Sequence, residues 1–277
     1  MIKQGQVIKI ISGFFDVVSK NKIYRLRASG TLRDNNLIPI VGDYVEFKND
    51  LLLTKVKERK NFLIRPKVAN IDLVAIIVSL SEPKFSSLLL DRFLAIIESQ
   101  NISTLIIFTK SDLGNNKPYY DYLSQNFNCL LINNKDKDFD WNKIKDNFKN
   151  KLTVFTGQTG VGKTSTLNNL LNKNEKTNEI SKSLGRGKHT TRVIEIFFDQ
   201  DIRIIDTPGF SSLEINLSKL ELAHSFFDFK EWSKKCKFST CIHYKEIDCE
   251  VKRNYQNNIL LKSRYENYIK MLLEAKD

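Results

Sequence analysis

The feature that most constrains this chain is the stretch at residues 157–164, which reads GQTGVGKT. It matches the phosphate-binding pattern G-x-x-x-x-G-K-[ST]. The apolar run LTVFT precedes it and the helical pattern TSTLNNLL follows it, which is the strand–loop–helix setting that the motif requires. The sequence therefore predicts an α/β nucleotide-binding domain. The motif begins at residue 157 of 277, so either a domain starts late or the earlier parts of this domain precede its phosphate loop.

The loop predicts a specific set of phosphate contacts. Its glycines let the backbone turn N–H groups toward phosphate oxygens, and the helix that follows adds its positive N-terminal end. Lys163 is expected to reach the β- and γ-phosphates and to assist catalysis, and the Thr164 hydroxyl is expected to bind Mg²⁺. The expected nucleotide-binding residues of this loop are Gly157, Gln158, Thr159, Gly160, Val161, Gly162, Lys163, Thr164 and Ser165.

A second motif, DTPG at residues 206–209, follows the apolar strand pattern IRIID. Asp206 is expected to hold Mg²⁺ through a water molecule, and the Gly209 N–H to sense the γ-phosphate. Taken alone, DTPG is also compatible with a turn or a helix cap. Its position downstream of a well-formed phosphate loop favours the magnesium role.

Between these motifs lies GRGKHTTR at residues 185–192, a basic, glycine-rich segment without apolar anchors. Thr190 or Thr191 is expected to complete the Mg²⁺ coordination when a γ-phosphate is bound. Ras-like proteins use a Gln after the DTPG-type motif to orient the attacking water, whereas this chain has Phe210. His189 is therefore the candidate catalytic residue. The alternative is a solvated basic loop whose histidine has no role in catalysis.

The base-reading motif [NT]-K-x-D occurs upstream of the phosphate loop, as Thr109, Lys110, Ser111 and Asp112. The Asp112 carboxylate can accept two N–H bonds from guanine, and adenine lacks that pair of donors. Asp112 could instead cap a helix, and an ATP-dependent kinase or ATPase could use the same phosphate loop. If the motif reads guanine, the order of motifs is that of a circularly permuted GTPase that uses Mg²⁺ with GTP.

Hydrophobic patterns predict three domains. Residues 1–66 contain about five short strands and indicate a small β-barrel, either OB-like or SH3-like. Residues 67–215 alternate strands and helices, as in a parallel sheet with crossover helices. Residues 216–277 are mainly helical. The strands expected in the central domain are 71–80, 103–110, 128–133, 152–157, 193–198 and 202–206, and the helices expected there and at the C-terminal end are 88–100, 141–150 and 257–275.

Charge indicates the class of partner. The net charge is +12, and residues 1–66 hold 13 Lys and Arg against 6 Asp and Glu. This favours a polyanion, nucleic acid above all, over a merely soluble basic surface. No signal peptide, membrane-spanning run or basic amphipathic helix is recognisable. The sequence also contains no coiled-coil pattern that would favour a dimer. We therefore expect a cytoplasmic monomer without a membrane partner.

Four cysteines divide into one isolated residue and one cluster. Cys129 is expected to be a buried small hydrophobic residue. The cluster, Cys236, Cys241, His243 and Cys249, supplies a Cys₃His set that favours one structural Zn²⁺ over a disulfide or free thiols. A closed four-ligand site leaves no position for a reactive water, so zinc would stabilise the small C-terminal domain.

These motifs, in this order, resemble the ribosome small-subunit-dependent GTPases of the RsgA family, also called YjeQ or YloQ. The resemblance covers nearly the whole chain and includes LGRGKHTTR, DTPGFSSLE and the Cys-Cys-His-Cys cluster. It implies an N-terminal OB domain, binding of the 30S subunit and its rRNA, a role in late maturation of that subunit, and hydrolysis of GTP to GDP that the subunit stimulates.

Two points qualify this interpretation. The second guanine-contacting loop usually carries a Ser-Ala pair, whereas this chain has LINNK at residues 131–135, with Asn133 or Asn134 as the candidate backbone donor. An RNA-binding factor with a vestigial GTP site is the competing hypothesis, and the intact Lys163, Thr164 and Asp206 argue against it. Because DTPG leads directly into the C-terminal domain, we expect nucleotide state to be coupled to the zinc domain.

Overall fold

The computed structural model describes residues 2–30, 32, 38–64, 66–112, 117–171, 194–207 and 215–276. The chain divides into two compact units. The first unit comprises residues 1–73, 140–155 and 163–208, and the second comprises residues 74–139, 156–162 and 209–277. The chain passes from one unit to the other several times.

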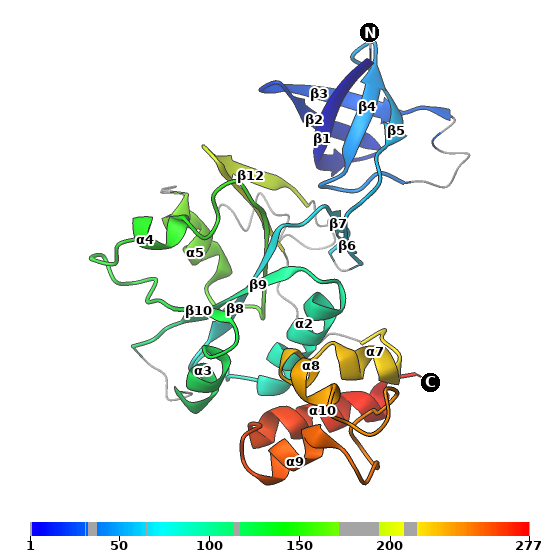
Figure 1. The fold of residues 1–277 in the computed structure, drawn as a ribbon. Helices are drawn as coiled ribbons and strands as arrows, with labels where there is room; N and C mark the ends of the chain where they lie inside the picture. The colour runs from blue at the N-terminus through cyan, green and yellow to red at the C-terminus, as the bar shows by residue number, and fades with distance from the viewer. Residues whose placement is uncertain are drawn as a thin grey trace. The chain divides into compact units, whose positions relative to one another are not determined.

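The first unit begins with a closed five-stranded barrel (blue in Figure 1). Its strands are β1 (Ile2–Ile11), β2 (Phe14–Ser19), β3 (Lys22–Ala28), β4 (Tyr44–Lys48) and β5 (Leu52–Val56). The order is β1-β2-β3-β5-β4, in which β5 pairs in parallel with β3 and β4 returns beside β1. Alternate side chains fill the interior, among them Val17, Leu26 and Phe47, all fully buried. The predicted small barrel is confirmed, and its Greek-key connection agrees with the OB-like alternative.

The rest of the first unit carries strands with short connections. A small ladder joins β6 (Phe62–Leu63) and β7 (Val68–Ala69). Strand β11 (Leu152–Thr156) pairs in parallel with β13 (Ile202–Asp206), and β12 (Ile196–Asp199) forms a hairpin with β13. Helix α5 (Lys163–Leu170) follows the phosphate loop. The predicted pair of strands after the switch segment is therefore present, with the first one shifted toward the C-terminus.

Helix α4 (Asn142–Lys145) is much shorter than the helix predicted over 141–150. The Asn147 side-chain amide donates a hydrogen bond of 3.0 Å to the Ile144 carbonyl, which offers the backbone an alternative to further helical turns. Asn150 then takes a left-handed conformation with φ 57°, and its N–H bonds to the Asp201 carbonyl. Local side-chain bonding thus ended a helix that the apolar periodicity extended.

The second unit contains the alternation of strands and helices that the sequence predicted, with one additional helix at residues 117–123 that it did not predict. Its elements are β8 (Leu73–Ser79), α2 (Ser87–Ser99), β9 (Ser103–Thr109), α3 (Lys117–Leu123) and β10 (Asn128–Leu131). Strands β9 and β10 pair in parallel, and within this unit the strand order is β10-β9-β8. Because β10 is an edge strand, Cys129 is only half-buried rather than a core residue as expected.

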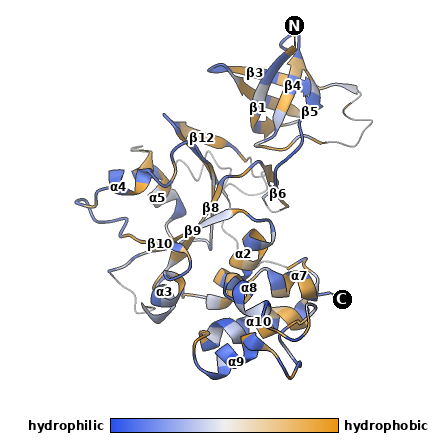
Figure 2. Cartoon of the chain, in the orientation of Figure 1, coloured by the Kyte–Doolittle hydropathy of each residue, from blue (hydrophilic) through white to orange (hydrophobic). Residues whose placement is uncertain are grey.

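The C-terminal part of the second unit is helical, with α7 (Lys219–His224), α8 (Phe227–Ser233), α9 (Glu250–Gln256) and α10 (Lys262–Glu274). Figure 2 shows both apolar and polar residues along α2 and α10, as expected for helices with one buried face. Their apolar residues share one core that includes Phe226, Phe229, Tyr268 and Met271. None of the helices in the described ranges is both long and apolar enough to span a membrane.

Helix α10 begins at Lys262, five residues later than the predicted start at 257. The preceding helix α9 (Glu250–Gln256) is followed by Asn258 at φ 57°, and the N–H groups of Ile259 and Leu260 both donate to the Asn254 carbonyl. This closure turns the chain after α9 and delays the start of α10 relative to the prediction.

Candidate nucleotide site and metal centre

Within the second unit, the base-reading motif lies against the phosphate loop. Thr109 ends the buried strand β9, and its Oγ1 donates a hydrogen bond of 2.6 Å to the Val161 carbonyl oxygen. Thr109 Oγ1 also lies 3.2 Å from the Val78 carbonyl oxygen on β8. The hydroxyl of a fully buried threonine therefore joins two neighbouring strands to a loop that comes some fifty residues later in the chain.

Lys110 continues this contact. Its backbone is left-handed, with φ 57°, and its Nζ lies 3.3 Å from the Gly160 carbonyl oxygen and within bonding distance of the Glu82 carbonyl. The lysine stem thus crosses from the base-reading motif to the phosphate loop, as expected. Asp112, two residues on, is exposed to solvent, where a nucleotide base could reach its carboxylate.

Backbone geometry explains the glycines of the phosphate loop. Gly157, Gly160 and Gly162 have φ angles of 139°, 84° and 100°, which residues with a side chain rarely adopt. A Cβ on Gly157 would lie 2.1 Å from the Ile77 carbonyl oxygen, and a Cβ on Gly162 would lie 2.8 Å from Asn134 Nδ2. At Gly157 the clash is with the backbone, so any other residue would displace the loop. At Gly162 the clash is with the end of a flexible side chain, and the positive φ is what disfavours another residue.

The loop after β10 also approaches the phosphate loop. Asn134 Nδ2 lies 3.5 Å from the Gly162 carbonyl oxygen, and Asn133 Oδ1 accepts a hydrogen bond of 3.0 Å from the Lys135 N–H. The side-chain contact of Asn134 was not foreseen, because the sequence offered these asparagines only as backbone donors. The clue to this contact was an amide side chain in a loop that usually carries small residues.

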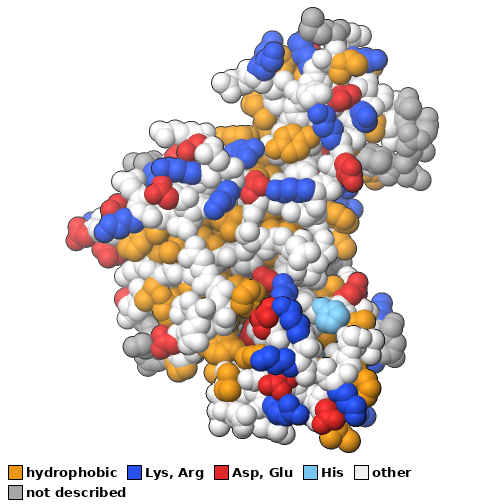
Figure 3. All heavy atoms as spheres, in the orientation of Figure 1, with side chains coloured by type: hydrophobic (Ala, Val, Ile, Leu, Met, Phe, Trp, Pro, Cys, Tyr) orange, Lys and Arg blue, Asp and Glu red, His pale blue; other side chains and the backbone are white. Residues whose placement is uncertain are grey.

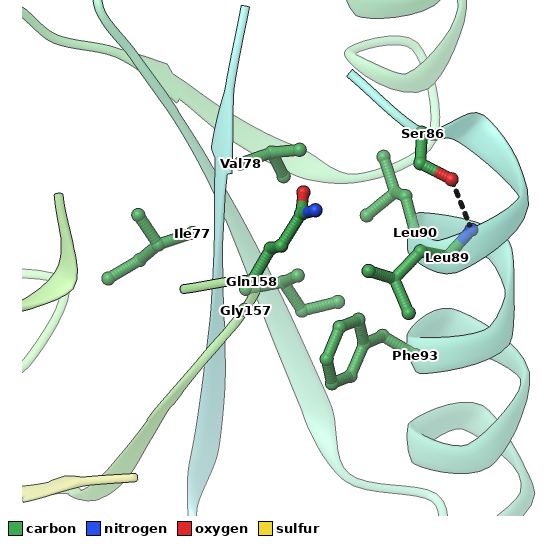
Figure 4. Close-up of a pocket in the computed structure, with 9 residues that line it drawn as sticks. Ile77, Val78, Ser86, Leu89, Leu90, Phe93, Gly157 and Gln158 are labelled. Carbon is green, nitrogen blue, oxygen red and sulfur yellow. Dashed lines mark hydrogen bonds between the residues drawn. The ribbon is translucent and has the colours of Figure 1, made fainter. Parts of the chain in front are cut away.

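Gln158 occupies a pocket between the phosphate loop and α2 (Figure 4). The pocket is lined by the apolar side chains of Leu89, Leu90 and Phe93 from α2 and by Ile77 and Val78 from β8, and the Gln158 side chain extends between these two elements. Gln158 is half-buried, so this part of the loop rests on the scaffold and leaves the exposed Thr159 and Gly160 facing solvent.

Within the first unit, the remaining phosphate- and metal-binding candidates occupy ends of regular elements. Lys163 is buried at the start of α5, and Thr164 follows it in the first turn, half-buried. Asp206 is buried at the end of β13 and pairs in register with Phe155, two residues before Gly157. His189, Thr190, Thr191 and Gly209 lie outside the described residues, so the geometry tests none of these candidates.

The Cys₃His cluster gathers four ligand atoms that could hold a metal ion. The ligand atoms of Cys236, Cys241, His243 and Cys249 all lie within 4.8 Å of one another. The Sγ atoms of Cys236 and Cys249 are 3.9 Å apart, and His243 Nδ1 lies 3.4 Å from Cys249 Sγ. Zn–S bonds of about 2.3 Å in a tetrahedron give S···S separations of ~3.8 Å. All the cysteines are free thiols, so the disulfide alternative fails within the part of the chain that the structure describes.

Protonation fits a ligand role for the cluster. Burial lowers the pKa of His243 to about 4, so the imidazole is neutral and can offer a nitrogen lone pair to a metal. Burial raises the pKa of the Cys241 thiol, and the neighbouring cysteines raise it further. A bound cation would reverse that effect, because thiolates repel one another less when a divalent metal lies between them.

A shell of hydrogen bonds holds the turn that presents His243, whose φ is 57°. The Glu246 carboxylate accepts the N–H groups of Ile242 and Tyr244 at 2.6 and 2.8 Å, and the Tyr265 hydroxyl donates to the His243 carbonyl at 2.8 Å. The sequence predicted the four clustered residues and missed these supports. Glu246, a carboxylate three residues after the histidine, was the available clue.

The chain is similar to known proteins over nearly its whole length. A family model described as RsgA GTPase matches residues 56–216, and one described as RsgA N-terminal domain matches residues 4–51. A protein of Mycoplasmopsis pulmonis named small ribosomal subunit biogenesis GTPase RsgA is 48% identical over 274 residues, covering 98% of this chain and 99% of that protein. Its namesake from Bacillus subtilis is 40% identical and covers 99% of this chain and 98% of that protein.

Solved structures agree with the sequence relatives. The crystal structure of YjeQ from Thermotoga maritima superposes with a TM-score of 0.83 at 30% identity, covering 99% of this chain and 98% of that one. The structure of YloQ, described as a circularly permuted GTPase, gives a TM-score of 0.78 at 34% identity, covering 99% of this chain and 95% of that one. The similarity therefore extends over the whole chain, barrel and helical region included.

Proposed function

The chain belongs to the RsgA family of GTPases, and we propose that it hydrolyses GTP to GDP on the small ribosomal subunit during the late maturation of that subunit. The observation that carries the proposal is the hydrogen bond from Thr109 to Val161, which joins a guanine-reading motif to a phosphate loop in permuted order. The names of the full-length relatives supply the ribosomal subunit as partner.

We assign the base to the TKSD motif. Asp112 accepts the two guanine N–H groups, and Lys110 lies along the base while its ammonium bonds to the loop. The phosphates bind the backbone N–H groups of residues 157–162, Lys163 and the N-terminal end of α5. An Asn134 backbone N–H near the guanine oxygen would complete the base contacts, and its side-chain contact with Gly162 supports that position.

Magnesium would be held by oxygen donors, which it prefers. Thr164, Asp206 and one of Thr190 or Thr191 form the proposed set, with the buried Asp206 at the strand end supplying the negative charge. When bound, the ion would supply positive charge that offsets the charge of the β- and γ-phosphates. Thr164 and Asp206 would hold the ion, and Lys163 would keep the terminal phosphate in place.

Hydrolysis requires a residue that orients water, and Phe210 cannot do so. We assign this task to His189, which is adjacent in sequence to the two threonines of the proposed magnesium set. Residue Gly209 would sense the γ-phosphate through its N–H. Because DTPG leads into the C-terminal domain, loss of the γ-phosphate would change the affinity of that domain for the subunit.

The Cys₃His cluster fits one structural Zn²⁺. The separations of its ligand atoms support this assignment, and the closed set leaves no position for a catalytic water. Zinc binding would then contribute to the folding free energy of the C-terminal helices, because the cluster joins the loop between α8 and α9 to the core of α10.

We propose that the barrel contacts rRNA. It combines basic and aromatic side chains: Arg27 lies over the Phe14 ring at 4.6 Å, and Lys22 lies over the Tyr24 ring at 5.3 Å. On the face shown in Figure 3, Lys and Arg side chains are spread over the barrel and the C-terminal region, with acidic side chains among them. Such a surface suits phosphate contacts with base stacking.

The remaining assignments follow from this function. We propose three domains, residues 1–66, 67–215 and 216–277, acting as a cytoplasmic monomer without a membrane partner. The competing function is an RNA-binding factor with an inactive GTP site. Turnover of GTP with and without purified small ribosomal subunits separates the two. Stimulated release of phosphate is expected, whereas equal, negligible turnover in both conditions would favour the inactive factor.

A further inference from the structure

A cluster of charged side chains is buried in the second unit, apart from the nucleotide motifs and the cysteine cluster. The Arg264 side chain is 1% exposed and those of Asp91 and Asp228 are 0% and 2% exposed. Arg264 forms a bidentate pair with Asp228, through Nε at 2.5 Å and Nη2 at 2.8 Å, and its Nη1 donates to Asp91 at 2.5 Å. One buried guanidinium therefore bonds to two buried carboxyl groups.

Neutral donors also bond to the two carboxyl groups. The Tyr119 hydroxyl donates to Asp91 and the Tyr122 hydroxyl to Asp228, each at 2.7 Å, and Asn267 Nδ2 donates to Asp91 at 2.8 Å. Burial raises the pKa of both tyrosines, so the hydroxyls remain protonated donors. Burial would also raise the pKa of Asp228, but Arg264 outweighs it and the pKa is lowered.

Stability alone is a poor explanation for this cluster. Replacing a buried ion pair by apolar residues of similar volume is often neutral or stabilising, because desolvation offsets the attraction between the charges. What a hydrogen-bonded buried cluster does supply is a fixed geometry, since each donor and acceptor accepts only a narrow range of directions. The elements that the cluster fixes therefore indicate its purpose.

The cluster joins the C-terminal helices to α2 and α3, the helices that precede and follow strand β9 and its base-reading motif. Arg264 and Asn267 belong to α10 and Asp228 to α8, whereas Asp91 belongs to α2 and the two tyrosines to α3. Helix α3 begins at residue 117, five residues after Asp112. Helix α2 follows the segment whose Glu82 carbonyl accepts from Lys110. Hydrogen bonds thus connect α10 directly to α2, and connect it to α3 through Asp91 and Asp228.

We propose that Arg264 is a positioning residue for guanine recognition, which holds α2 and α3 so that Lys110 and Asp112 face the base. The proposal rests on the proposed binding of GTP at Asp112. It makes the C-terminal helices part of the base-reading apparatus, through a route separate from the DTPG segment. Because coupling is reciprocal, guanine nucleotide bound at Asp112 stabilises the packing of α10 on α2 and α3.

The test compares GDP with inosine diphosphate, which lacks the exocyclic amine and so offers Asp112 one N–H fewer. Arg264→Lys keeps the charge and loses the bidentate fork. Tyr119→Phe and Tyr122→Phe delete only a hydroxyl and serve where Arg264→Lys does not fold. In these variants, the dissociation constant for inosine diphosphate divided by that for GDP is expected to fall by about fivefold, the lower end of measured couplings between sites. Zinc content is expected to stay unchanged. Arg253→Lys, at an exposed arginine, is the matched control and keeps the wild-type ratio.

Two results distinguish the possible failures. If both tyrosine variants keep wild-type zinc content and melting temperature and also keep the wild-type preference for GDP over inosine diphosphate, the positioning role is wrong. If the wild-type protein itself binds ADP as well as GDP, the proposed guanine site is wrong, and the cluster has no base-reading apparatus to position.

Discussion

Thr109 Oγ1 and the Val161 carbonyl oxygen are joined by a hydrogen bond of 2.6 Å that links the base-reading motif to the phosphate loop. Thr109→Val keeps the shape of the side chain and leaves the buried Val161 carbonyl without this donor. Loss of a buried hydrogen bond costs about 1–3 kcal/mol. We expect GDP affinity to fall by about tenfold, corresponding to ~1.4 kcal/mol, in calorimetric titration.

Strand β9 offers a matched control for this substitution. Thr104 Oγ1 is buried and has no hydrogen-bond partner among the described residues. Thr104→Val therefore makes the same chemical change in the same strand without removing a bond, and GDP affinity is expected to stay at the wild-type value. Equal affinities in the two variants would show that the Thr109 contact does not support nucleotide binding.

Asp112→Asn is expected to weaken guanine binding, because the neutral amide offers one acceptor oxygen where the carboxylate offers two. A hydrogen bond to a charged group contributes about 1.5–3 kcal/mol, so GTP affinity should fall ~10- to 100-fold and the preference over ATP should shrink. Competition between labelled GTP and unlabelled ATP measures this. Asp121→Asn, at an exposed site on α3, should leave the preference intact. Undiminished discrimination in Asp112→Asn would contradict the assignment.

The sequence predicted that TKSD contacts the phosphate loop, whereas it misplaced the limits of two helices. The phosphate loop, TKSD and the cysteine cluster were readable because each is a local pattern in which spacing determines chemistry. Their assembly was partly readable too, since residues at the ends of neighbouring parallel strands meet at one edge of a sheet. The Thr109–Val161 bond is the physical form of that expectation.

Features that depend on distant partners were not readable. Arg264 looks like one more solvated charge in a helical pattern, and only packing shows that Asp91, 173 residues away, shares its hydrogen bonds. Similarly, the early end of α4 depends on the Asn147 side chain bonding back to Ile144, which competes with periodicity. Apolar spacing predicts that a helix exists far better than where it stops.

Removal of one ligand should separate structural zinc from a bystander role of the cysteines. Cys249→Ser is expected to abolish stoichiometric zinc and to lower the melting temperature, because metal bound only by the folded state stabilises that state. Cys129→Ser, at the half-buried cysteine of β10, is the control and should retain one zinc per chain. Metal analysis together with thermal unfolding measures both effects. A fully loaded, equally stable Cys249→Ser protein would exclude this residue as a ligand.

His189→Ala is expected to leave GTP binding unchanged and to reduce subunit-stimulated hydrolysis by about 10²- to 10⁴-fold, the range for loss of a group that acts on the proton or position of the nucleophile. Single-turnover release of phosphate in the presence of small ribosomal subunits is the measurement. The exposed His224 of α7 provides the matched control, since His224→Ala removes an imidazole at a site remote from the nucleotide motifs in sequence. Stimulated turnover at the wild-type rate in His189→Ala would assign water orientation to another group.

Substitutions on the barrel should change the salt dependence of subunit binding. Lys22 and Arg27 are exposed on β3, and each lies over an aromatic ring. If their charges contact rRNA phosphates, Lys22→Ala and Arg27→Ala each release fewer counterions on binding. The slope of log affinity against log salt concentration then decreases in magnitude by about 0.7–0.9 per lost contact. Lys143→Ala, at an 80% exposed lysine of α4, should leave the slope unchanged. Equal slopes in all three variants and the wild type would mean that these barrel charges do not contact phosphate.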